Sequence, residues 1–189
     1  MAMLLKAGSG ILYMKVGTHA KESLAEIIQR KREEIEHAGY ALWGYGGNTC
    51  HPLSMVQPFA RDFERRAGKI YLCMQPMDSK HFAEPLRATE SSVDGHNWQV
   101  IPEGVNVLGS RYALVIKDLH EERFSLALTK TRVAIGPCLG RTGDQYIAGR
   151  VDKACLEVVD DGVTIETDEP SREIQLVAEI ADPFAVFVR

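Results

Sequence analysis

An aromatic and glycine-rich segment at residues 42–48 is the first candidate for chemistry. It reads Leu-Trp-Gly-Tyr-Gly-Gly-Asn, so that Trp43 and Tyr45 alternate with glycines and Asn48 closes the run. Glycine lets the backbone approach a flat ligand closely, and an aromatic ring can stack on a nucleobase. The amide of Asn48 carries both a donor and an acceptor, as reading a base edge requires. The segment therefore predicts a base-binding loop, with a core tryptophan and a simple glycine turn as the alternative.

A thiol and an imidazole follow directly, at Cys50 and His51. Together they are the groups of a cysteine nucleophile and its base. Adjacent side chains on an extended chain point to opposite faces, so a working pair would take its histidine from elsewhere in the sequence. The candidate distant partners are His19, His81, His96 and His120. An enzyme with a Cys nucleophile, a hydrolase or a transferase, stays open as an alternative, beside a buried cysteine with a loop histidine.

Two arginines stand beside glycines, where a phosphate could be held. Arg141 lies in the glycine-containing segment 136–143, ahead of an expected helix whose first N–H groups would attract an anion. Arg111 follows Gly109 and Ser110 at the start of an expected strand. A guanidinium matches a phosphate in a bidentate manner. The segment lacks the Gly-Lys-Ser/Thr ending of a P-loop, so we predict simple anion contacts, with plain turns as the alternative.

Composition limits the classes of function. The chain has 189 residues, 45% apolar and 25% charged, with a net charge of −4. These values suit one globular domain, which we expect over residues 11–189 after a flexible lead at residues 1–10. An acidic chain does not suit a protein that coats nucleic acid through phosphate contacts.

The four cysteines are widely spaced and form no C-x-x-C pair, which favours reduced thiols in the cytoplasm. Cysteines and histidines also lack the spacing of metal ligands, so we expect no metal and no other cofactor. No apolar run approaches the length of a membrane span, so we expect no membrane partner.

Hydrophobic periodicity then gives the elements that must position these residues. We predict helices at 20–38, 52–67 and 145–159, and strands at 11–16, 69–74, 99–101, 111–117, 124–135, 163–166 and 174–180, with a final apolar segment at 184–188. Lys31 interrupts the apolar stripe of the first helix, and Pro58 leaves open a division of the second into two. Residues 75–97 are expected to form an irregular connection, the segment that would order on a partner if the chain were a protein-interaction domain.

The order of these elements predicts an α+β fold. Strands follow one another after residue 99 without intervening helices, which excludes a doubly wound parallel sheet. We expect a strongly bent mixed or antiparallel sheet of at least five strands. The helices at 20–38 and 145–159 are expected to pack against it as flanking helices.

The first 75 residues resemble EVE and ASCH domains of the PUA-like superfamily. The resemblance rests on Leu-Tyr-Met-Lys at 12–15 in the first strand, Leu-Trp-Gly at 42–44, and Gly-Lys-Ile-Tyr-Leu at 68–72. It covers residues 11–75, and the acidic residue that follows the tryptophan in the family is Gly44 here. The resemblance implies a PUA-like barrel that binds a modified base or RNA in a pocket beside Trp43.

Taken together, these patterns favour a binding module for a nucleotide or a single modified base. Trp43 and Tyr45 would stack, Asn48 would form hydrogen bonds, and Arg111 and Arg141 would contact phosphate. The expected partner is a small nucleotide or one modified base, and the chain is a possible homodimer.

Overall fold

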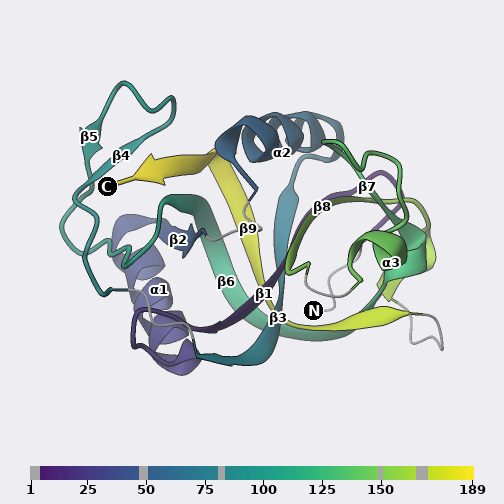
Figure 1. Ribbon diagram of the computed structural model, residues 1–189, viewed down its shortest axis with the longest axis horizontal. Coiled ribbons are helices and arrows are strands. Elements are labelled where there is room, and N and C mark those ends of the chain that lie inside the picture. The colour runs from purple at the N-terminus through teal and green to yellow at the C-terminus, as the bar shows by residue number, and fades with distance from the viewer. Residues whose placement is uncertain (1–4, 47–50, 81–83, 149–150, 165–169) are drawn as a thin grey trace.

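A computed structural model describes residues 5–46, 51–80, 84–148, 151–164 and 170–189 (Figure 1). The elements in chain order are β1 (Gly10–Thr18), α1 (Leu24–Ala38), β2 (Ala41–Tyr45), α2 (Leu53–Ala67), β3 (Ile70–Lys80), β4 (Glu90–Ser92), β5 (Gln99–Val100), β6 (Tyr112–Ala127), η1 (Leu128–Lys130), β7 (Thr131–Val133), α3 (Gly143–Tyr146), β8 (Lys153–Val158), η2 (Asp161–Thr164) and β9 (Ser171–Val188). This order confirms the expected α+β class. In the part of the chain that the structure describes, no helix is long and apolar enough to cross a membrane.

One mixed sheet organises the molecule. Its main strand order is β2-β6-β9-β3-β1-β8-β7, and β4 joins it through β9 while pairing with β5. The β1–β3 pair is parallel, and the other strand pairs are antiparallel. Among the described residues β2 and β7 do not pair with each other, so the sheet is bent but not closed into a barrel.

The two longest strands pair with each other along an irregular register. β6 has 16 residues and β9 has 18, and their register shifts at three places along the pair. A register shift inserts extra residue length on one strand and increases its local twist. Asp118 has a positive φ of 53° at the second shift, between Lys117 and His120. Figure 1 shows the result, with α1 near β2 at one end of the sheet and α3 near β7 at the other.

The sheet buries apolar side chains on both faces. Leu12, Met14 and Val16 of β1 pack into one core cluster with the apolar sides of α1 and α2. The alternate residues Ile11 and Tyr13 pack into a second cluster on the other face. A strand that is buried on both faces appears in the sequence as a continuous apolar run, as β1 does. The second cluster also includes Leu5, whose side chain is 1% exposed.

Helix α1 begins at Leu24, four residues later than expected, because a capping box forms at Ser23. The Ser23 hydroxyl accepts from the Glu26 N–H, and the Glu26 carboxylate accepts from the Ser23 N–H. Such reciprocal bonds satisfy two N–H groups that the helix leaves without partners. Gly39 ends the helix in the left-handed conformation, with φ of 84°.

Helix α2 is continuous across Pro58, so its division into two helices is excluded. Proline removes the bond to the carbonyl four residues earlier, here that of Ser54. Both Pro58 and Ser54 are exposed, so water can satisfy that carbonyl. The opposite side of the helix buries five residues: Leu53, Val56, Phe59, Ala60 and Phe63. Their burial holds the helix on the sheet.

Several predicted segments differ from the structure. The strand expected at 124–135 is divided among β6, η1 and β7. The helix expected at 145–159 is wrong, because α3 is only Gly143–Tyr146 and β8 occupies Lys153–Val158. The connection expected at 75–97 is partly strand, since β3 runs to Lys80 and β4 covers Glu90–Ser92. Val163 and Thr164 belong to η2 instead of a strand, and residues 165 and 166 lie outside the described ranges.

Candidate functional site

A cavity of about 410 Å³ opens at the end of the sheet that carries β2. Its walls come from the second half of β1, the first turns of α1, the end of β2, the loop at residues 106–111, and the residues that enter β8. The volume lies in the range of about 300–1,000 Å³ that small-molecule sites occupy. This cavity is the candidate site.

Pairing between β2 and β6 brings three of the predicted ligand-binding residues to this cavity. Trp43 lies opposite Leu114 and Tyr45 opposite Tyr112, so Arg111 comes to the same end of the sheet. All three predicted residues line the cavity. The Arg111 guanidinium carbon is 5.5 Å from the centroid of the Tyr112 ring, and the side chain is exposed at the rim.

The two aromatic residues form a wall of the cavity and also belong to the core. Trp43 and Tyr45 are each 5% exposed and pack in the cluster beneath α1 and α2. The Tyr45 hydroxyl donates to the carbonyl of His51 at 2.9 Å, and its ring lies 5.5 Å from that of Tyr112. Their rings are therefore held in place before any ligand arrives.

Gly44 permits a close approach between β2 and the loop that faces it. A Cβ atom on Gly44 would lie 2.3 Å from the hydroxyl oxygen of Ser110, well inside van der Waals contact. Part of the glycine signal in the sequence thus reflects backbone packing against Ser110. Gly46 also lines the cavity, and a Cβ there would meet nothing closer than 3.8 Å.

Two of the remaining predicted residues, Arg141 and His51, do not line the cavity. Arg141 is exposed in a turn beside β7, at the opposite end of the strand order, and the helix after it has only four residues. His51 is 7% exposed and contributes its carbonyl to Tyr45. Asn48 and Cys50 lie outside the described residues.

A tight turn between β1 and α1 sets two side chains at the cavity. His19 and Glu22 exchange backbone hydrogen bonds of 3.1 and 2.9 Å around Ala20 and Lys21. Both central residues have positive φ, 51° and 67°, the pattern of a type I′ turn, which usually carries asparagine or glycine. Here neither residue is of those types, so the turn stores backbone strain while placing His19 and Glu22 in the cavity wall.

Replacing Lys21 with asparagine is expected to stabilise the protein. Lys21 is exposed, and asparagine tolerates the left-handed conformation that costs other residues about 1–2 kcal/mol. We expect the free energy of unfolding in urea to rise by about 0.5–1 kcal/mol. The matched control is Lys6→Asn, an exposed lysine with ordinary φ; equal stability of the two variants would show that the turn is not strained.

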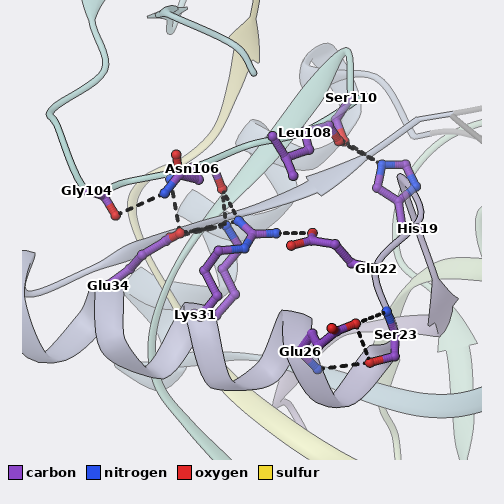
Figure 2. A network of polar contacts seen from close by, with 11 residues as sticks. His19, Glu22, Ser23, Glu26, Lys31, Glu34, Gly104, Asn106, Leu108 and Ser110 are labelled. Atoms are coloured by element: carbon purple, nitrogen blue, oxygen red, sulfur yellow. Dashed lines mark hydrogen bonds and ion pairs between the residues drawn. The ribbon is translucent and has the colours of Figure 1, made fainter. Parts of the chain in front are cut away.

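A group of charges, of which Lys31 and Glu34 are buried, joins α1 to the loop at residues 106–111 that lines the cavity (Figure 2). Lys31 donates to the Glu34 carboxylate at 3.1 Å and to the Asn106 carbonyl. Glu34 also accepts from the Asn106 N–H at 3.0 Å. Arg30 donates to the same Asn106 carbonyl at 2.7 Å and to Glu22 at 2.5 Å. The helix and the loop are thus joined by both side chains and backbone.

Lys31 is 2% exposed, which makes it one of the most buried residues on its helix. Burial lowers the pKa of its ammonium to about 8, although the nearby Glu34 carboxylate favours the charged form. In the sequence Lys31 interrupts the apolar stripe. The signal that would have identified its role is Glu34, one helical turn later on the same face.

The cavity carries an excess of positive charge in an acidic chain. Its lining includes five cationic residues, Lys15, Arg30, Lys31, Arg111 and Lys153, and two acidic ones, Glu22 and Asp152. The whole chain has a net charge of −4, so this concentration of cations is local. Low-dielectric walls focus the field of such charges on a bound ligand. The cavity therefore favours an anion.

The described residues near the cavity do not form an activated nucleophile. The His19 Nε2 atom lies 2.8 Å from the Leu108 carbonyl and 3.3 Å from the Ser110 hydroxyl oxygen. A carbonyl can only accept, so Nε2 must carry a proton and cannot act as a base toward Ser110. Burial raises the pKa of the Cys73 and Cys155 thiols far above neutral, which leaves both inert. Within the described ranges, no three His, Cys, Asp or Glu side chains are grouped as metal ligands would be.

No protein-family model matches this chain, and neither does any curated protein or solved structure. The function is therefore inferred from the cavity and its chemistry.

Proposed function

We propose that this protein is a binding module for a nucleotide or a modified nucleobase, and that the cavity beside Trp43 is its site. The observation that carries the proposal is the meeting of Trp43, Tyr45 and Arg111 on one cavity from distant parts of the chain. A nucleotide needs an apolar, aromatic surface for its base and cations for its phosphate. This cavity offers both.

The base would lie against the aromatic wall. Met14, Val16 and Val107 extend that wall with aliphatic surface, and Gly44 and Gly46 present backbone in place of side chains. A planar base fits such a wall because every base has an apolar face, whatever polar groups its edges carry. Asn48 remains the proposed reader of the base edge, and Arg111 at the rim remains a proposed phosphate contact.

The resemblance of residues 11–75 to EVE and ASCH domains supports this proposal. We propose that the chain is a divergent relative of that PUA-like group, with the cavity where the resemblance implies a ligand. The acidity of the chain suits a single nucleotide or one flipped base better than a polymer. The proposal includes a cytoplasmic location and a homodimer.

The test is a set of thermal melts with a panel of nucleotides and modified nucleosides. A ligand that binds the native state raises the melting temperature by mass action. At least one panel member is expected to stabilise the wild type. The Trp43→Phe variant keeps the fold but loses part of the aromatic wall, so we expect its affinity for that ligand to fall about fivefold, the lower end of measured stacking energies.

The matched control is Trp98→Phe, the same change at a tryptophan outside the cavity lining. It is expected to leave the affinity unchanged. If no panel member shifts the wild type, the proposed function is wrong. If both variants bind like the wild type, the ligand does not contact Trp43.

A further inference from the structure

Two lysines buried in the cavity wall differ in how many partners they have. Lys31 is 2% exposed and Lys153 is 6% exposed, and both line the cavity. Burying an ammonium group is costly unless its donors are used. In the described part of the chain, only one of the two, Lys31, has all of its ammonium donors bonded to the protein.

Lys31 is occupied. Its ammonium donates to both oxygens of Glu34, at 3.1 and 3.4 Å, and to the Asn106 carbonyl. These partners come from its own helix and from the loop that the helix contacts. Three donors meet three acceptors, so Lys31 has a structural role.

The Lys153 ammonium group has fewer acceptors around it. Among the described residues, its ammonium has one hydrogen-bond partner, the carboxylate of the adjacent Asp152 at 3.2 Å. The Asp152 side chain is 29% exposed, so water already solvates it, while that of Lys153 is 7% exposed. An ammonium carries three donors. Lys153 is therefore a buried cation with donors available to a ligand.

The strand register points Lys153 into the cavity. Lys153 is the direct antiparallel partner of Met14 on β1, and directly opposite side chains share a face of the sheet. Met14 lies on the face that carries the cavity. The Lys153 side chain thus extends from β8 toward the same space that Trp43 and Arg111 border.

We infer that Lys153 is the binding residue for a phosphate group of the ligand. The inference rests on the proposed function and narrows it: the ligand is a nucleoside phosphate instead of a free base or a nucleoside. Two acidic residues also line the cavity, and each is paired with a cation of the lining: Glu22 with Arg30 at 2.5 Å and Asp152 with Lys153 at 3.2 Å. The five cationic residues of the lining outnumber them. Lys15 and Arg111 add positive charge to the same cavity.

The experiment compares ribonucleoside 5′-monophosphates, the matching nucleosides and inorganic phosphate at constant ionic strength. Dissociation constants are measured by calorimetry for the wild type and for Lys153→Gln. The monophosphates are expected to bind the wild type about 10- to 100-fold more tightly than the nucleosides, because charge-assisted hydrogen bonds are strong in a buried site. In Lys153→Gln this preference for the monophosphate is expected to fall about 5- to 10-fold, because Arg111 and Lys15 remain, while nucleoside affinity stays at the wild-type value.

Two control variants separate this role from others. Lys6→Gln removes the same charge from an exposed residue outside the cavity lining. The ratio of the nucleoside and monophosphate dissociation constants should therefore stay at its wild-type value. Lys153→Met should melt no lower than the wild type without ligand, because it replaces a buried charge with an apolar chain. A marked loss of stability there would show that Lys153 has a structural role and would overturn the inference.

The outcomes distinguish this inference from the proposed function. If nucleosides bind as tightly as monophosphates, or Lys153→Gln keeps the wild-type ratio, the phosphate assignment is wrong and the base-binding module stands. If inorganic phosphate stabilises the wild type but not Lys153→Gln, while no nucleoside or nucleotide binds, the anion site stands and the nucleotide proposal fails. If none of the three probes binds, both are wrong.

Discussion

Replacing Glu34 with glutamine is expected to lower the free energy of unfolding by about 3–5 kcal/mol, the usual cost of breaking a buried ion pair by removing one partner. The side chains of Lys31 and Glu34 are 3% and 2% exposed, so water cannot take over the lost interaction. Glutamine keeps the size of the side chain but leaves the Lys31 ammonium without its counter-charge. The Asn106 contacts that hold the loop against α1 would weaken with it.

Urea unfolding at neutral pH measures this effect. The matched control is Asp62→Asn, which removes a carboxylate from an exposed helical pair with Arg66 at 2.8 Å, whose side chains are 58% and 50% exposed. That change should cost less than about 1 kcal/mol. Replacing both buried charges, as Lys31→Met with Glu34→Leu, should recover most of the loss. A similar, small effect of Glu34→Gln and Asp62→Asn would contradict the structural role given to the buried pair.

Replacing Trp43 with alanine is expected to cost about 3–5 kcal/mol of stability, as large-to-small changes at buried aromatic residues do. Trp43 is 5% exposed and packs among side chains from both helices and the sheet. Its removal would merge a void in the core with the cavity. A domain of ordinary stability would then be close to unfolding at physiological temperature.

The same substitution at the second tryptophan provides the control. Trp98 is partly exposed, and its ring lies under the Arg189 guanidinium, whose carbon is 3.9 Å from the ring centroid. Trp98→Ala should therefore cost only about 1 kcal/mol, the loss of an exposed cation–π contact and some surface packing. Unfolding in urea compares the two variants. Equal losses would mean that Trp43 contributes no more to the core than a surface residue does.

The elements that the sequence predicted well have local signals. β1 is an apolar run between two glycines, β3 begins shortly after Gly68, and α1 ends at Gly39. These features depend on neighbouring residues alone. For this reason the bounds of β1 lie within two residues of those predicted and α1 ends at the predicted residue, whereas β3 continues six residues beyond its predicted end.

The helix predicted at 145–159 shows where such signals fail. Ile147, Val151, Ala154, Cys155 and Val158 fall near helical spacing in the sequence. In the structure Ala154 and Cys155 are both buried, one in each core cluster, because β8 has protein on both faces. A strand of this kind lacks alternation and cannot be told from a buried helix by periodicity. The same error concealed the burial of Lys153, because a helix at these residues would place Lys153 on its charged face.

The candidate site was predictable in part. The residue types of Trp43, Tyr45 and Arg111 indicate base and phosphate binding. Their meeting at one cavity depends on β2–β6 pairing across almost 70 residues of chain. Arg141 had the same local features as Arg111, but it lies beside β7 at the other end of the strand order. Non-local pairing separates the two arginines, and no local pattern encodes it.

The central position of β9 has a consequence for synthesis of the protein. β9 lies between β6 and β3, although it is the last described strand to leave the ribosome. At about 5–20 residues per second, β6 would wait several seconds for this partner, and β3 longer still. Until then the nascent chain would expose unpaired, largely apolar strand edges, a state to which chaperones bind. Ribosome-associated chaperones would therefore stay in contact with this chain until β9 emerges, and the sheet would assemble after that point instead of strand by strand.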